Sequence, residues 1–338
     1  MPPRGLVRPV PLDPSGEAGP TRGQAQGPRW RQTTKGFYVP SNVDDEVSEQ
    51  RILEQSVRLP PGGAVNGWAG LRLARAAYFD GLRPGGRESR PVPLVVPPSS
   101  KLRGLPGSSV CREPLDPREV RVVLGVPATV TVRALFDELR SLDDWREAVV
   151  AMDMAAAAVL VSVAEMRSYL GTKRSWRRSS GLAKVLDLAD EESLSPGETR
   201  MRLVWVVDAG LPRPLSNRPI FTLEGRLLGY ADLFDPSAGV VGEYDGGTHL
   251  RLDRQTSDVD REDQFRRAGL EYFKVTGLDM HHRGRVVDRM KAARSRAIER
   301  PGQERRWTLL PPPWWRGRET AADLLNHRDW LRAQHDSA

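Results

Sequence analysis

Apolar residues at helical spacing alternate with short apolar runs from about residue 36 to residue 190. Trp68, Leu71 and Tyr78 recur on one face of a helix, which predicts a helix over 66–82. A proline-bounded apolar run at 91–100 predicts an edge strand. The other elements expected here are a strand, a polar turn and a helix over 36–60, short strands around 110, 120–124 and 129–132, and helices over 133–161 and 161–171. This pattern predicts one mixed domain of helices and short strands.

The pattern is clearer from Ser195 onward. Ser195 is typical of a helix N-cap and Pro196 of a first helical position, so a helix is predicted over 195–210. The remaining predicted elements are strands over 214–222, 226–235 and 239–245, a helix over 257–268, a strand over 271–277 and a helix over 284–299. The predicted order is therefore helix, strand, strand, strand, helix, strand, helix, which indicates an α/β (mixed α+β) domain over 191–300.

The two ends of the chain have a different composition. Residues 1–35 are basic and rich in proline and glycine, which predicts a disordered tail. Residues 301–338 combine a proline–tryptophan segment with a short helix. We expect Trp307, Trp314 and Trp315 to pack against a domain rather than to bind a partner.

Composition excludes several classes of protein. The chain has 338 residues, of which 39% are hydrophobic, and no apolar run approaches the roughly 20 residues of a membrane helix. Its N-terminus lacks the apolar core of a secretory signal, so we expect a cytoplasmic protein. The one cysteine, Cys111, excludes an intrachain disulfide and a multi-cysteine metal site, and a buried structural thiol is expected. A net charge of +7 favours anionic partners, DNA first.

A basic loop at 172–181 joins the two predicted domains and contains one aromatic residue. Such a loop either contacts phosphates and stacks on a base, or is a solvated linker, and the sequence favours neither. The candidate DNA-binding residues are Lys173, Arg174, Trp176, Arg177 and Arg178.

An acidic hairpin at 226–254 is the strongest indication of chemistry. If its turn centres between residues 237 and 238, Asp232 faces Glu243, and Asp245 shares their face. Carboxylates that close repel one another unless a cation lies between them, which favours a site for Mg²⁺ or Mn²⁺. His249 follows as a candidate general base. The alternatives are a solvated hairpin and, for Glu198, a capping box with Ser195 that requires no catalytic role.

The segment from Ser195 to about Arg300 carries a resemblance to a known family. Its motifs are SPGETRMR, GYAD, EYDG followed by a histidine, and a helix pattern before EYFKVT. They resemble the Vsr-like branch of the PD-(D/E)XK, or restriction-endonuclease-like, nuclease superfamily, and more closely a group of uncharacterised actinobacterial proteins. About a third of the chain is covered.

The resemblance implies roles for particular residues. Asp232 matches the metal-binding aspartate, Glu243 the second acidic ligand, and Glu198 a glutamate that some members carry on the first helix. Asp245 stands where the usual motif has a lysine, so we expect His249 to take part of that role. Lys274, on the next strand, could also supply a charge, although an exposed strand lysine is the simpler interpretation.

Residues 36–190 are similar, more faintly, to the AbiEi-type antitoxin of abortive-infection systems, on the strength of GFYVP, GWAGLRLARAAYFDG and RALFDELR. This resemblance implies a winged helix and DNA binding. Three hypotheses follow: a Mg²⁺-dependent DNA endonuclease, a non-catalytic antitoxin-like DNA-binding regulator with a degenerate nuclease fold, and a toxin–antitoxin or defence component with a protein partner.

Overall fold

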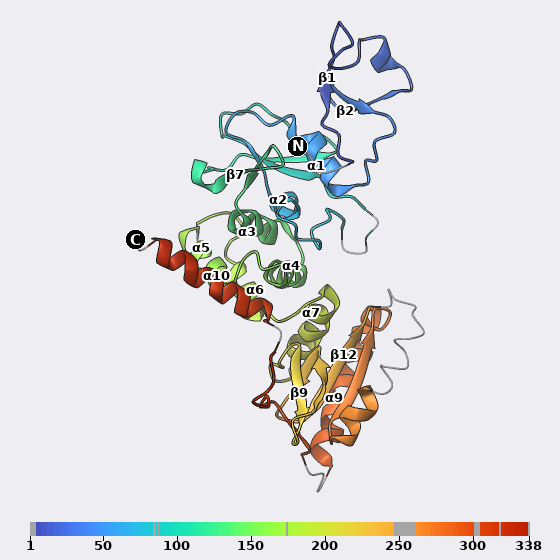
Figure 1. The fold of residues 1–338 in the computed structure, drawn as a ribbon, viewed down its shortest axis with the longest axis vertical. Coiled ribbons are helices and arrows are strands. Elements are labelled where there is room, and N and C mark those ends of the chain that lie inside the picture. Colours follow the sequence, from blue (N-terminus) through green and yellow to red (C-terminus); the bar gives the residue numbers. More distant parts are fainter. Residues whose placement is uncertain are drawn as a thin grey trace. The chain divides into compact units, whose positions relative to one another are not determined.

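The computed structural model describes residues 5–83, 86, 88–173, 175–246, 261–300, 305–317 and 319–336 (Figure 1). The fold is mixed α+β. The chain forms two compact units: Met1–Asp143 with Ala164–Leu182, and Asp144–Val163 with Ala183–Ala338. This division differs from the predicted boundary near residue 190. The helix α4 (Trp145–Ala157) belongs to the second unit because its Asp153 carboxylate is 2.6 Å from the guanidinium of Arg202.

The first unit is built on a five-stranded sheet of order β6-β5-β4-β8-β7. Its strands are β4 (Ala64–Val65), β5 (Val92–Val95), β6 (Ser108–Cys111), β7 (Val120–Val123) and β8 (Val126–Thr129). Its helices are α1 (Ser48–Ser56), α2 (Gly67–Leu73), α3 (Thr131–Ser141) and α5 (Val163–Thr172), with 3-10 turns η1 (Gln24–Gln26) and η2 (Pro117–Glu119). The predicted elements are largely confirmed, but α2 is shorter than 66–82 and the strand expected at 129–132 ends at Thr129.

A small sheet of order β1-β3-β2 precedes this core, from β1 (Val10–Pro11), β2 (Trp30–Thr34) and β3 (Phe37–Pro40). The prediction of a disordered tail over 1–35 is therefore wrong for its described residues. Side chains from α1 hold the segment in place: Arg31 pairs with Glu54 at 2.7 Å, and the Gln50 amide donates to the Val7 carbonyl at 2.9 Å. A composition rich in proline and glycine predicts a flexible segment, but it does not show which residues far away in the sequence will contact that segment.

The second unit follows the predicted order. After α4 and α6 (Leu182–Leu188) come α7 (Pro196–Leu203), the π-helical turn η3 (Val204–Asp208), β9 (Arg218–Thr222), β10 (Leu227–Ala231), β11 (Leu233–Asp235) and β12 (Val240–Asp245). Residues 261–267 are helical, and β13 (Glu271–Thr276), the 3-10 turn η4 (Asp279–His282) and α9 (Arg283–Glu299) follow. The one strand predicted over 226–235 is divided at Asp232, where the chain bends.

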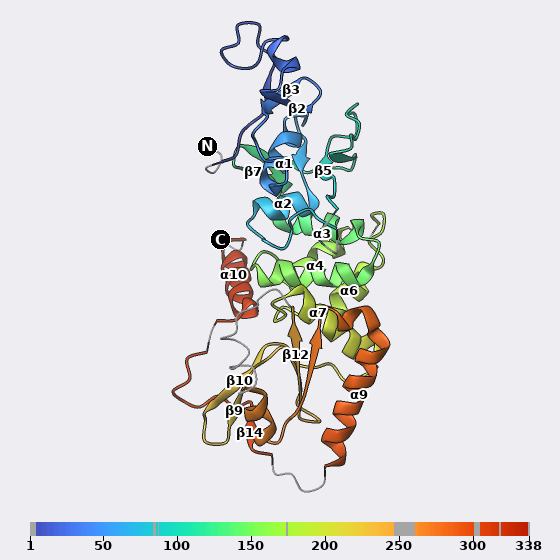
Figure 2. The same cartoon turned by 90° about the vertical axis from the view of Figure 1, so that its right-hand side faces the viewer.

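A sheet of order β11-β12-β13 lies at the centre of this unit, with β11 antiparallel and β13 parallel to β12. On one face, Val240, Phe273 and Val275 pack with residues of α7, η3 and α9. On the other face, Val241 and Tyr272 pack with residues of β9, β10 and the helix 261–267. Figure 2 shows α9 and the β9–β10 strands on opposite sides of β12.

The C-terminal segment packs onto the second unit, as predicted. The strand β14 (Trp307–Thr308) pairs with β9, and Trp307 is buried. The Trp315 ring contacts Phe221 edge-on, whereas Trp314 is exposed. The helix α10 (Ala321–Asp336) follows. Within the described residues, no helix combines the length and apolar character that crossing a membrane requires.

Candidate active site

The predicted hairpin register is confirmed where the two strands pair. Leu233 lies opposite Gly242, and Asp235 lies opposite Val240. The turn is fixed by the Asp235 carboxylate, which accepts hydrogen bonds from the Ser237 amide at 2.9 Å and the Ser237 hydroxyl at 2.6 Å. Asp235 is thus a turn residue, and the register brings Asp232 to the level of Glu243.

The Asp232 carboxylate lies at the bend between β10 and β11 and turns toward β12. Its Oδ2 accepts a hydrogen bond from the Tyr244 amide at 2.8 Å. The pKa of Asp232 is raised to about 7, mainly by burial and then by the charges of Glu198 and Glu243, while the Tyr244 hydrogen bond and the charge of Arg261 lower it. Asp232 is therefore a buried carboxyl group that lies near two other acidic side chains.

Glu243 projects from β12 and is buried, with a relative exposure of 5%. Its Oε2 accepts hydrogen bonds from the Arg261 guanidinium at 2.7 Å and from the Tyr272 hydroxyl at 3.2 Å. These two donors come from the helix 261–267 and from β13, so two further elements fix the orientation of this carboxylate.

Glu198 has the capping role that its sequence context predicted. The Ser195 hydroxyl accepts from the Glu198 amide at 3.2 Å, and Glu198 Oε2 accepts from the Leu194 amide at 2.9 Å and the Asn217 side chain at 2.7 Å. The negative charge of Glu198 is nevertheless close enough to Asp232 to raise the pKa of that carboxyl group. The start of α7 is pressed against β12, because a Cβ at Gly197 would lie only 1.9 Å from the Tyr244 ring.

Asp245 does not join the other carboxylates as the sequence predicted. Its Oδ2 is 2.9 Å from the Lys274 ammonium, which projects from the neighbouring strand β13. Among the described residues, no group of three or more histidine, cysteine or acidic side chains is arranged to hold a metal ion. Among these residues, Asp232 and Glu243 are the predicted carboxylates that lie near one another, and Asp245 is paired with Lys274.

The donor chemistry of Asp232 and Glu243 suits a hard divalent cation. Both side chains offer carboxylate oxygens on adjacent segments, and a cation beside them would favour the charged form of Asp232, whose pKa burial and then neighbouring carboxylates raise. These two residues would hold Mg²⁺ or Mn²⁺, and water would fill the other positions. His249 lies outside the described residues.

The predicted DNA-binding loop is mostly engaged within its own unit. Lys173 pairs with Glu119 at 3.3 Å, and Arg178 pairs with Asp143 at 2.8 Å. The Trp176 ring contacts Phe136 edge-on and has the Arg133 guanidinium 4.6 Å above it. Trp176 is therefore a packing residue here rather than a stacking platform. Arg177 is exposed, and Arg174 lies outside the described residues.

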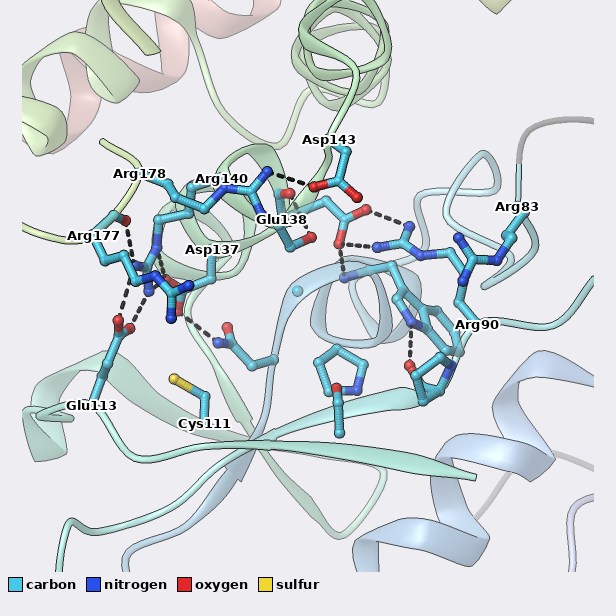
Figure 3. Close-up of a pocket in the computed structure, with 17 residues that line it drawn as sticks. Arg83, Arg90, Cys111, Glu113, Asp137, Glu138, Arg140, Asp143, Arg177 and Arg178 are labelled. Carbon is cyan, nitrogen blue, oxygen red and sulfur yellow. Dashed lines mark hydrogen bonds and ion pairs between the residues drawn. The ribbon is translucent and has the colours of Figure 1, made fainter. Parts of the chain in front are cut away.

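The first unit also contains a hollow of about 490 Å³ that the sequence did not reveal (Figure 3). Its charged walls are held by internal ion pairs: Arg90 binds Glu138 at 2.5 Å, and Arg140 binds Asp137 at 2.6 Å. Cys111 lines the hollow, and burial, followed by the charge of Glu113, raises the pKa of its thiol to about 11. The lining residues are spread along the sequence from Asn66 to Arg178, so no local sequence motif predicts the hollow.

Comparison with known proteins gave no match among family models, curated proteins or solved structures. The resemblances to Vsr-like nucleases and to AbiEi-type antitoxins accordingly stay predictions.

Proposed function

We propose that the second unit is a restriction-endonuclease-like domain that hydrolyses phosphodiester bonds of DNA with Mg²⁺ or Mn²⁺. The observation that carries this proposal is the side-by-side placement of Asp232 and Glu243, with the pKa of Asp232 raised to about 7 by burial and by neighbouring carboxylates. Such clustering of acidic groups is costly for a purely structural hairpin. The order of the elements from α7 to α9 supports the proposal, because the resemblance implies a helix, then strands, then a helix and a further strand.

Each residue of the site has a distinct task in this proposal. Asp232 and Glu243 hold the metal, which supplies activation of a water molecule and charge neutralisation at the phosphate. Arg261 and Tyr272 orient Glu243 through their hydrogen bonds to its Oε2. These bonds leave the carboxylate little rotational freedom, which preorganises it for binding.

Lys274 provides the positive charge that the superfamily's usual lysine would supply at position 245. The superfamily's usual lysine would stand at 245, and the Lys274 ammonium is 2.9 Å from the carboxylate at that position. We infer that Lys274 acts from the neighbouring strand as an electrostatic partner of the phosphate, with Asp245 positioning it.

A plasmid-cleavage assay tests the proposal. Purified protein is incubated with supercoiled DNA and Mg²⁺ or Mn²⁺, and the nicked and linear products are quantified. Asp232→Asn and Glu243→Gln should each abolish cleavage. The matched controls Asp288→Asn and Glu299→Gln change exposed acidic residues of α9 and should cleave as the unmodified protein does. Cleavage that persists in both Asp232→Asn and Glu243→Gln excludes this site.

One observation favours the alternative, a non-catalytic DNA-binding regulator. Asp245 and Lys274 neutralise one another, and two carboxylates are a small ligand set for a metal. In that case the protein binds DNA with strong salt dependence but shows no divalent-ion binding in calorimetry. A protein partner of a toxin–antitoxin or defence system would instead be detected by co-purification that is lost on deletion of the tryptophan-containing C-terminal segment, residues 301–338.

A further inference from the structure

We propose that a cationic hollow in the second unit binds the backbone phosphates of DNA. The hollow has a volume of about 450 Å³, and its arginines are Arg226, Arg267 and Arg306. All three are exposed, whereas the lining residues Leu228 and Ala268 are buried. The inference rests on the proposed function for the identity of the anion.

Three segments far apart in the sequence bring these arginines together. Arg226 ends the β9–β10 turn, where its amide donates to the Thr222 hydroxyl at 3.2 Å and its carbonyl accepts from the Thr222 amide at 2.8 Å. Arg267 is the last residue of the helix 261–267. Arg306 is fixed beside that helix, because its amide donates to the Ala268 carbonyl at 3.3 Å.

The charge balance of the hollow favours an anion. The described residues that line it include three arginines and one acidic residue, Glu224. The nearest ion pair of Arg267 is with Asp263 at 3.6 Å, and both side chains are largely exposed, at 81% and 57%. An exposed pair of this kind contributes little free energy, so a phosphate can replace the carboxylate. Guanidinium groups also match phosphate geometry well.

The position of the hollow relative to the carboxylates fits a DNA duplex. Arg226 and Asp232 lie at the two ends of β10, six residues apart, which corresponds to about 20 Å along a strand. The helix 261–267 leads from one place to the other with a rise of about 9 Å, since Arg261 contacts Glu243 and Arg267 lines the hollow. Spans of about 9–20 Å equal about three to six base pairs, so one duplex can contact both.

The experiment is a fluorescence-anisotropy titration of a labelled 20-base-pair duplex with the full chain, in EDTA and at increasing KCl. Under these conditions no metal is present, and binding is measured apart from cleavage. The test variant is Arg226→Gln/Arg267→Gln/Arg306→Gln. The control variant Arg283→Gln/Arg285→Gln/Lys291→Gln removes the same charge from exposed positions of α9, on the opposite side of the central sheet. Circular dichroism checks that both variants fold.

The expected result is a change in salt dependence specific to the test variant. Each phosphate contact contributes about −0.9 to the slope of log K against log salt, so loss of three contacts reduces the steepness of this negative slope by about 2.7. The control variant should retain the slope of the unmodified protein. Equal slopes in the two variants, or no duplex binding by the unmodified protein, overturn the inference. A shallower slope combined with absence of plasmid cleavage supports the inference and overturns the proposed nuclease function alone.

Discussion

Replacing Gly197 by alanine tests how the start of α7 supports the candidate site. A Cβ at this position would lie 1.9 Å from Tyr244 Cε1 and 2.3 Å from Cδ1, where an ordinary contact is 3.4 Å or more. The partly buried Tyr244 ring also packs against the hydrophobic core between the central sheet and α9, so moving it disturbs that packing. Either the ring or the start of α7 must therefore shift.

Overpacking of this kind costs about 1–3 kcal/mol. We expect Gly197→Ala to lower the free energy of unfolding by that amount, measured by urea denaturation at pH 7. The displacement also moves the Tyr244 amide, whose 2.8 Å hydrogen bond holds Asp232, so plasmid cleavage should fall as well.

Gly284→Ala is the matched control. Gly284 lies in α9 of the same unit, and its Cβ would meet no atom within 4 Å. Alanine is favoured over glycine in a helix by about 1 kcal/mol, so this variant should be slightly more stable than the unmodified protein. A Gly197→Ala protein as stable as Gly284→Ala would refute the argued contact between α7 and Tyr244.

Three further predictions concern single side chains. Lys274→Gln should lower the cleavage rate by about 100–1,000-fold while leaving the fold intact, because it removes charge stabilisation at the phosphate; an unchanged rate would show that Lys274 does not have that role. The sole thiol, Cys111, has its pKa raised to about 11, so its reaction with a disulfide reagent should accelerate steadily from pH 8 to 10; a plateau near pH 9 would contradict this. Hydrogen bonds from Arg289 and from the Thr276 amide hold the pKa of Asp279 below its usual value, so Asp279 stabilises the fold above its unfolded pKa, and the contribution is lost as pH falls through its folded pKa. Asp279→Asn should therefore cost about 1 kcal/mol at pH 7 and clearly less at pH 3, as urea denaturation at the two pH values would report.

The hairpin was predictable because its determinants are local. A turn residue at Asp235 and a glycine at 239, with φ of +73°, fix the register that brings Asp232 level with Glu243. The bounds of α9 were likewise foreseen within one residue, since its apolar face repeats at helical spacing.

The partners of the carboxylates were not predictable in the same way. Lys274 reaches Asp245 across a parallel pair of strands whose connection passes through a helix, and Arg261 reaches Glu243 from that helix. A single sequence does not give the register of such a pair. The same limit explains why the strand at 30–34 and the hollow around Arg140 were not predicted. Both depend on contacts between segments that lie far apart in the sequence.

Isothermal titration of the metal-free protein with Mn²⁺ tests the proposed centre most directly. The account predicts saturable binding to the unmodified protein and to Asp288→Asn, and loss of that binding in Asp232→Asn and in Glu243→Gln. Binding of equal affinity in all four proteins, or no binding to the unmodified protein, would contradict it.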